Sequence, residues 1–159
     1  KAIGDRKIEF VEPDLGSQAY LDAIRVHQEN APLDWMLFDA YDALSMYSWA
    51  AGILSVMRPC LNELQALTGE LVGEEDSLFA DILNRRVLLA QESGDVRESI
   101  ELGEQALAIS RRQLGPDHPN VGVSLINLGR SYVELGETAR AIELIEEGIA
   151  IEVAKFGNE

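Results

Sequence analysis

The sequence has few of the residues that hold small domains together by cross-links or by a β-sheet core. Cys60 is its single cysteine, so no disulfide can form within the chain. This residue stands in an apolar run, which predicts a buried and inert thiol. Aromatic residues make up only 6% of the chain. Most of its apolar mass is Leu, Ala and Ile, a balance that favours packed helices over a sheet.

Proline and long apolar runs are also scarce. Four of the five prolines stand near expected boundaries, whereas Pro59 lies inside a helical pattern and should start, kink or break a helix there. The longest apolar stretch, residues 49–57, is interrupted and too short to cross a bilayer. Because nothing resembles a signal peptide either, we expect a cytoplasmic protein.

Positive charge is in short supply, since the formal net charge is −15. A field this negative repels phosphate backbones and anionic lipids, which argues against nucleic acid and membranes as direct partners. A neutral or basic protein partner fits better. The plainer alternative is that the surplus Glu only keeps an exposed helical surface soluble.

The residue patterns of catalysis are missing as well. Two histidines and one cysteine, far apart in the sequence, make no metal-binding pattern. The sequence contains no glycine-rich phosphate loop, nucleophile elbow or paired-carboxylate motif. We therefore expect neither an enzyme nor a bound cofactor.

What the sequence does have is an internal repeat of 42 residues. When the chain is shifted by that length, the segment from Gly94 falls on the segment from Gly136. Identical pairs include the glycines at both ends of the segment and the apolar pairs Ile100/Ile142, Leu102/Leu144 and Ile109/Ile151. One further step back aligns Gly52 with Gly94, with weaker similarity. The register predicts units at about 33–73, 77–115 and 119–157, after a lead-in of residues 1–32 with one probable helix at 17–29.

Each unit has the pattern of two helices. In the last unit Val121, Leu125, Leu128 and Tyr132 recur at helical spacing, and Gly136 ends that helix. A second apolar stripe follows from residue 141 to 149. Short turns of this kind join antiparallel helices. In the middle unit, Asp95 and Glu98 have the spacing of a reciprocal helix cap.

The sequence contains the connector Leu114-Gly115-Pro116-Asp117-His118-Pro119, followed by Leu125, Asn127-Leu128-Gly129, Tyr132, Gly136, Ala141 and Glu143-Leu144. This pattern resembles the 42-residue tetratricopeptide repeat of kinesin light chains. Gly148 stands where that family usually has Ala. The resemblance implies an all-α, right-handed superhelical solenoid of about three antiparallel helix pairs plus an N-terminal helix. It also implies that the His118-Pro119 pair is structural.

In that family the first helix of each pair lines a concave surface that binds peptides or helices of other proteins. Mapped through the register, this resemblance implies a site made of Asp81, Asn84 and Arg85 in the middle unit and Asn127, Arg130 and Glu134 in the last. Val123, Ile126, Leu88 and Glu92 are further candidates, as are Asp39, Asp42, Met46 and Trp49 in the first unit.

Each candidate also has a plainer role. Asn127 could bond the backbone of an extended ligand, because an amide both donates and accepts, or it could bridge helices within the stack. The guanidinium groups of Arg85 and Arg130 could hold a ligand carboxylate or pair with neighbouring acids.

Two functions follow from the resemblance. The first is a scaffold or regulatory module that binds a protein or peptide on the concave face. The alternative is a sensor that closes on a small effector or signal peptide and regulates an attached domain. Exposed repeat ends also predict that the chain can form a homodimer.

Overall fold

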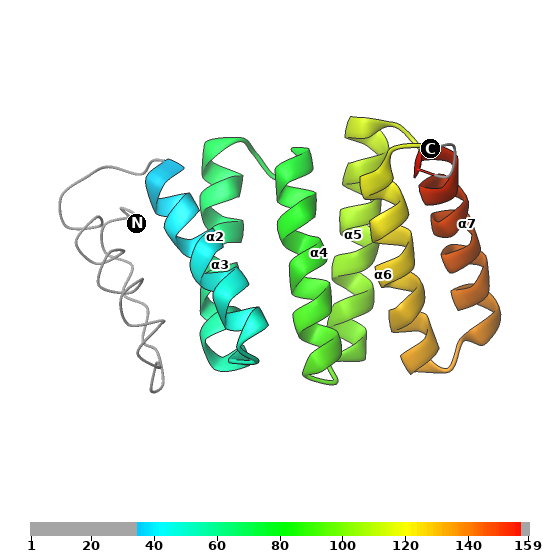
Figure 1. The fold of residues 1–159 in the computed structure, drawn as a ribbon, viewed down its shortest axis with the longest axis horizontal. Coiled ribbons are helices and arrows are strands. Elements are labelled where there is room, and N and C mark those ends of the chain that lie inside the picture. Colours follow the sequence, from blue (N-terminus) through cyan, green and yellow to red (C-terminus); the bar gives the residue numbers. More distant parts are fainter. Residues whose placement is uncertain (1–34, 157–159) are drawn as a thin grey trace. The chain divides into compact units, whose positions relative to one another are not determined.

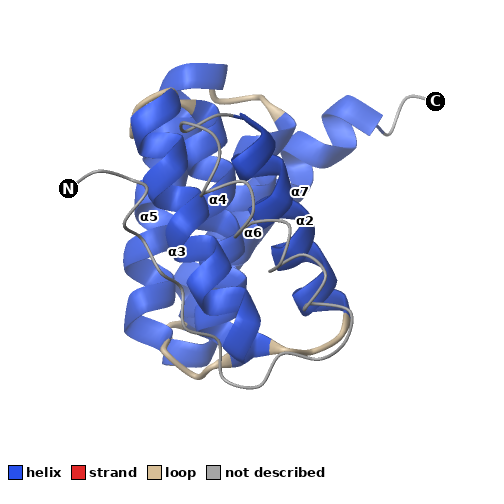
Figure 2. Ribbon diagram, turned by 90° about the vertical axis from the view of Figure 1, so that its left-hand side faces the viewer, coloured by secondary structure: helices blue, strands red, loops and turns tan. Residues whose placement is uncertain are grey.

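The computed structural model describes residues 35–156, and every regular element in that range is a helix (Figure 2). The helices are α2 (Trp35–Ala50), α3 (Leu54–Leu71), α4 (Ser77–Glu92), α5 (Val96–Leu114), α6 (Pro119–Leu135) and α7 (Thr138–Phe156). The helix expected at residues 17–29 lies outside the described residues. None of the described helices is both long enough and apolar enough to cross a membrane.

The chain divides into two compact units, residues 1–71 and 72–159. In the first, α2 and α3 form one helix pair around fully buried side chains that include Tyr41, Leu44, Leu61 and Leu64. Helix α3 continues through Pro59, so a helix neither starts nor breaks there, and the third alternative, a kink, stays a prediction. Proline removes one backbone donor, whose acceptor would be the carbonyl of Ser55. The residue that carries this carbonyl, Ser55, is exposed.

The second unit consists of two helix pairs, α4–α5 and α6–α7, which follow one another in Figure 1. Two apolar clusters hold it together. The first joins α4 to α5 through Phe79, Ala80, Leu83, Val87, Leu102, Ala106 and Ile109. The second joins α5, α6 and α7 through Leu107, Val121, Leu125, Leu128 and Leu144. Leu107 of α5 therefore packs into the next helix pair.

Glycines with positive φ mark the repeat register. Gly52, Gly94 and Gly136 have φ values of 71°, 75° and 89° and end the first helix of each pair. Their 42-residue spacing extends the repeat into the first unit, where sequence similarity is weak. A left-handed residue directly after a helix favours glycine, because a side chain is strained there.

The first helices of the last two pairs, α4 and α6, begin with the same kind of side-chain cap. The Asp76 carboxylate accepts from the backbone N–H of Leu78 at 2.8 Å, and His118 Nδ1 accepts from that of Asn120 at 3.2 Å. His118 is the register equivalent of Asp76, and the structural role expected for it is confirmed.

The reciprocal cap expected at Asp95 and Glu98 does not form. Asp95 is the N-cap of α5, but its side chain makes no capping hydrogen bond. Glu98 turns instead to α4, where it accepts from Arg86 at 2.9 Å. An ion pair between the two helices takes the place of the local cap.

Candidate functional site on α4 and α6

Helices α4 and α6, the first helices of two successive pairs, are joined by hydrogen bonds between side chains. Asn84 Nδ2 donates to Ser124 Oγ at 2.8 Å, and both residues are buried. Nearer the connectors, Asn120 Nδ2 donates to Asp81 Oδ1 at 3.1 Å. The partners are 40 and 39 residues apart in the sequence, which reflects the repeat length.

Gln91 makes the same connection near the other end of the two helices. Its Nε2 donates at 2.9 Å both to the backbone carbonyl of Asn127 and to Ser131 Oγ. Ser131 Oγ also donates to the Asn127 carbonyl within its own helix, at 3.3 Å. Gln91 and Ser131 are buried. The three connections extend over most of the two helices and fix α4 against α6.

These connections leave two amide oxygens buried without a hydrogen-bond partner, Asn84 Oδ1 and Gln91 Oε1. Burial also acts on Asp81, whose carboxyl pKa is raised above its ordinary value. Arg85, Asn120 and His118 favour the charged form of Asp81, but the cost of burial outweighs them. The polar interface therefore carries a cost in stability that apolar packing would avoid.

One side of α6 remains open beside this interface. Val123, Arg130 and Glu134 follow one another at spacings of seven and four residues, which places them on one face, and all three are exposed. The register equivalents on α4 are Asp81, Leu88 and Glu92. Asp81 and Leu88 are partly buried and Glu92 is exposed. We call these two rows, with Arg85 and Asn127, the α4–α6 face.

Five of the six predicted site residues belong to the two rows or stand beside them in the repeat register. One of the five, Asn127, is buried, with 9% of its surface exposed, and connects the helices through its backbone carbonyl. The sixth, Asn84, lies in the interface between α4 and α6 and bonds within the stack.

Sequence reasoning did not single out the other residues of the interface, Gln91, Asn120, Ser124 and Ser131. A signal for them was present. Ser124 and Ser131 stand one heptad apart, on a helical face where small polar side chains would leave room for longer amides opposite.

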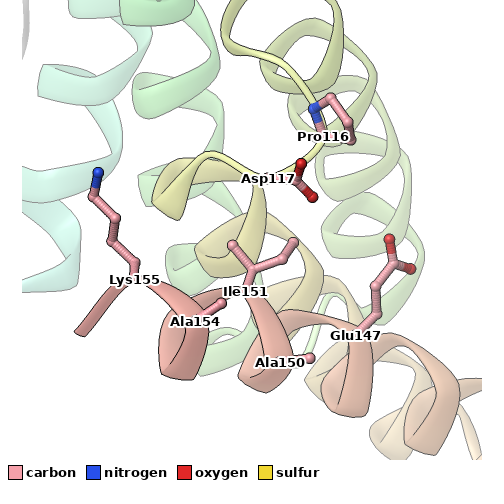
Figure 3. Close-up of a pocket in the computed structure, with 7 residues that line it drawn as sticks. All are labelled: Pro116, Asp117, Glu147, Ala150, Ile151, Ala154 and Lys155. Carbon is pink, nitrogen blue, oxygen red and sulfur yellow. The ribbon is translucent and has the colours of Figure 1, made fainter. Parts of the chain in front are cut away.

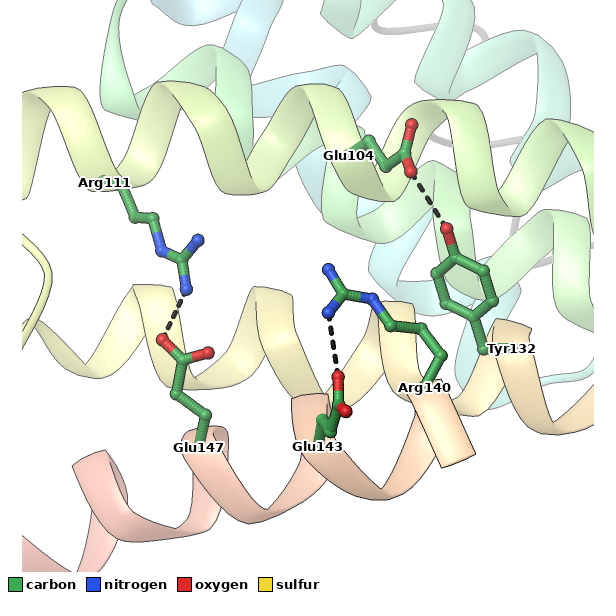
Figure 4. A network of polar contacts seen from close by, with 6 residues as sticks. All are labelled: Glu104, Arg111, Tyr132, Arg140, Glu143 and Glu147. Carbon is green, nitrogen blue, oxygen red and sulfur yellow. Dashed lines mark hydrogen bonds and ion pairs between the residues drawn. The ribbon is translucent and has the colours of Figure 1, made fainter. Parts of the chain in front are cut away.

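A second set of polar contacts connects α5, α6 and α7 (Figure 4). The Tyr132 hydroxyl donates to Glu104 at 3.0 Å, and burial together with Glu104 raises the pKa of that hydroxyl. Arg111 pairs with Glu147, and Arg140 pairs with Glu143 at 3.0 Å. Since these side chains are largely exposed, the pairs add little to stability.

A shallow hollow of about 470 Å³ lies between the α5–α6 connector and α7. Pro116, Asp117, Glu147, Ala150, Ile151, Ala154 and Lys155 line it (Figure 3). The figure shows these side chains dispersed around an open space, and Glu147 is already paired with Arg111. Within residues 35–156 no group of three or more His, Cys, Asp or Glu side chains could hold a metal ion.

Comparison with known proteins identifies relatives of the helix pairs. Residues 78–151 match the family model of the tetratricopeptide repeat. The curated protein KINESIN LIGHT CHAIN-RELATED 2 of Arabidopsis thaliana is 29% identical over 84 residues, which are 53% of this chain and 13% of that protein. The recognition of a kinesin-light-chain-like repeat is confirmed.

Two crystal structures show the same fold. That of BtubC (BKLC) from P. vanneervenii has a TM-score of 0.78 at 22% identity, and the match covers 90% of this chain and 57% of that one. The nearly identical TPR-like repeats of a Podosopora anserina protein, assigned to the kinesin light chains, have a TM-score of 0.74 at 21% identity, with 88% and 67% covered. The expected all-α fold of helix-pair repeats is confirmed.

Proposed function

Because residues 78–151 match the family model of the tetratricopeptide repeat, we propose that this chain is an interaction scaffold whose α4–α6 face binds a segment of a partner protein. The repeats and their kinesin-light-chain-like neighbours are of the protein-interaction scaffold type. The chain spans 13% of the curated relative and 57% of the first solved structure. The proposal therefore concerns these repeats and not the activity of a longer protein.

The observation that carries the proposal is the set of hydrogen bonds that joins α4 to α6. Hydrogen bonds from Asn84 and Gln91 hold the two helices in register, and the exposed row of α6 lies directly beside them. A surface held in place before binding loses little conformational freedom when a ligand arrives.

The side chains of this face suggest the chemistry of its ligand. Glu92 and Glu134 end the two rows with negative charge, and the chain as a whole carries −15. Val123 offers an exposed apolar contact, and Arg130 offers a forked donor for a carboxylate or a backbone carbonyl. We infer a neutral or basic peptide segment that sets apolar side chains on Val123.

A displayed library of random peptides tests this proposal and does not require that the partner be identified. Peptides selected on the wild-type chain are measured again on Arg130→Ala and on Val123→Ala, which truncate exposed side chains and leave the interface intact. We expect at least a tenfold loss of affinity on both. The control is Arg97→Ala, an exposed position on α5, where affinity should not change.

Equal binding to all three variants would contradict the proposal, because the peptides would then contact another surface. A clear decrease in the radius of gyration on binding would instead favour the sensor alternative. A scaffold with α4 and α6 already fixed should keep its radius.

Three further expectations belong to this proposal. We infer a non-enzymatic role, which the scaffold type of the repeats supports, and a cytoplasmic location. Self-association through an exposed repeat end stays a prediction from the sequence. Light scattering over a wide concentration range tests it, and a monomer throughout would remove it.

A further inference from the structure

The repeat register assigns a partner to each side chain that joins one helix pair to the next. Leu107 of α5 is buried in the cluster formed with Val121, Leu125 and Leu128 of α6. Its equivalent one repeat later is Ile149 of α7, which is 49% exposed. Ile149 thus has the position of an interface residue, but no described helix covers it.

The same correspondence holds along the rest of α7. Ile100 of α5 packs against the second cluster, and its equivalent Ile142 is 50% exposed. Arg111 pairs with Glu147 of the next helix pair, and its equivalent is the exposed Val153. Three apolar side chains therefore form an exposed row on α7 at the positions where α5 meets its successor.

The equivalents on α6 differ in chemistry from their counterparts on α4. Asn84 and Gln91 donate hydrogen bonds to serines of the next pair. One repeat later these positions hold Ile126 and Val133, which cannot form such bonds, and Val133 is 55% exposed. We call Ile126, Val133, Ile142, Ile149 and Val153 the end face.

We propose that the end face is a docking surface for one further helix pair of the same 42-residue type, whose first helix carries apolar side chains where α6 carries Ser124 and Ser131. The argument rests on continuity, because each member of the end face is the equivalent of a residue in the existing α4–α5 contact with α6–α7. It also rests on complementarity, because Ile126 and Val133 would leave an opposing hydroxyl without an interhelical partner. It is independent of the peptide-binding role of the α4–α6 face.

A second copy of this chain is the competing occupant. Two molecules that each carry −15 repel one another. The α6 helix of a copy would also bring serines to the apolar positions. Both features favour a helix pair of different composition.

The experiment extends the full chain in register. A copy of residues 116–157 is inserted after Gly157, either unchanged or with alanine at the equivalents of Ser124 and Ser131. We expect the alanine version to unfold in a single transition, at a temperature roughly 3 °C or more above that of the unchanged version. The same Ser124→Ala change at its original position should lower the unfolding temperature, because Asn84 then loses its acceptor.

Ile149→Glu is the matched control for the surface itself. In the unextended chain it changes an exposed side chain and should leave the unfolding temperature nearly unchanged. In the extended chain it should abolish the rise in unfolding temperature that the alanine version shows over the unchanged version. The proposal would be overturned if the serine-to-alanine changes shifted the unfolding temperature in the same direction in the inserted copy and at the original position. It would also be overturned if the inserted copy added no helical signal. A concentration-dependent dimer of the unextended chain that Ile149→Glu abolishes would overturn it too, in favour of a second copy.

Discussion

Asn84 on α4 donates a hydrogen bond of 2.8 Å to Ser124 on α6, across two successive helix pairs. Both side chains are buried, and the Ser124 hydroxyl in turn donates a hydrogen bond to the Asn120 carbonyl at 3.0 Å. The contact joins residues 40 positions apart and holds the spacing of the α4–α6 face. Loss of this hydrogen bond should therefore lower the free energy of unfolding.

Ser124→Ala should lower the free energy of unfolding by about 1–3 kcal/mol, because it leaves the buried Asn84 amide without its acceptor. Chemical denaturation measures this change through the midpoint at constant slope.

Ser110→Ala is the matched control on α5. The Ser110 hydroxyl is fully buried and has no hydrogen-bond partner. Its removal should be neutral or raise stability by up to about 1 kcal/mol, since an unsatisfied buried group is lost and Ala is the better helix former. Equal losses in both variants would show that the bond to Asn84 has no special weight.

Gly148→Ala should destabilise the chain, although the repeat family usually has Ala there. A Cβ at Gly148 would lie 2.8 Å from the backbone carbonyl oxygen of Gly122 and 2.8 Å from Ile126 Cγ1. Helices α6 and α7 would have to move apart. Overpacking costs about 1–3 kcal/mol, which exceeds the gain of up to about 1 kcal/mol in helix propensity. Thermal unfolding of the variant measures the net loss.

The control for this prediction is Gly103→Ala. There the nearest atom is the terminal Cδ1 of Leu128, at 3.0 Å, and a flexible side chain can yield. The change should be neutral or stabilising. A Gly148→Ala variant at least as stable as the wild type would mean that α6 and α7 are not held as close as described.

Asp81→Asn should stabilise the chain at neutral pH. Burial raises the pKa of Asp81 in the folded state, so the folded state binds the proton more tightly than the unfolded state. Stability from this group is present at pH below its unfolded pKa of about 3.9 and is lost as pH rises through the higher folded pKa. The variant should therefore unfold at a higher temperature than the wild type at pH 7, with the difference vanishing near pH 3.

Glu134→Gln, at an exposed position on the same face, removes one negative charge without the burial term. It separates the local effect of Asp81 from the general relief of negative charge. If both variants gave the same pH-dependent gain, burial of Asp81 would not be its cause.

Cys60 should resist thiol reagents in the folded chain. It is fully buried, and burial, with a smaller contribution from Glu63, raises the pKa of its thiol to about 12. The reactive thiolate is therefore almost absent at neutral pH. Labelling should be slow in buffer and fast in denaturant, and the single cysteine makes the signal unambiguous. Rapid stoichiometric labelling of the native chain would show that α3 opens readily.

Much of the fold was predictable because the features that determine it recur every 42 residues. Gly94 and Gly136 end the first helices where expected, and the Leu125–Leu128 stripe packs as its helical spacing indicates. For Pro59 the sequence predicted a start, a kink or a break, and α3 neither starts nor breaks there, because the effect of a proline depends on whether the carbonyl that it frees is accessible to water. That accessibility is a tertiary property.

The site was less accessible to sequence reasoning. The family resemblance, mapped through the repeat register, assigned Arg130 and Glu134 to a binding surface, yet it could not show whether Asn84 points to a ligand or to the next helix. That choice depends on Ser124 and Ser131 of α6, which accept the hydrogen bonds of Asn84 and Gln91. Ile126 and Val133 stand at the repeat positions of Asn84 and Gln91. This change from amide to apolar side chain can be interpreted only once the hydrogen-bond partners of the two amides are known.

The most direct test of the interaction role is a chemical-shift map of the isotope-labelled chain titrated with a library-selected peptide. We predict that the largest backbone amide shifts fall on residues 81–92 of α4 and 123–134 of α6, and that Arg130→Ala removes them at the same peptide concentration. Shifts confined to α5 and α7 would contradict the assignment of the α4–α6 face as the binding surface.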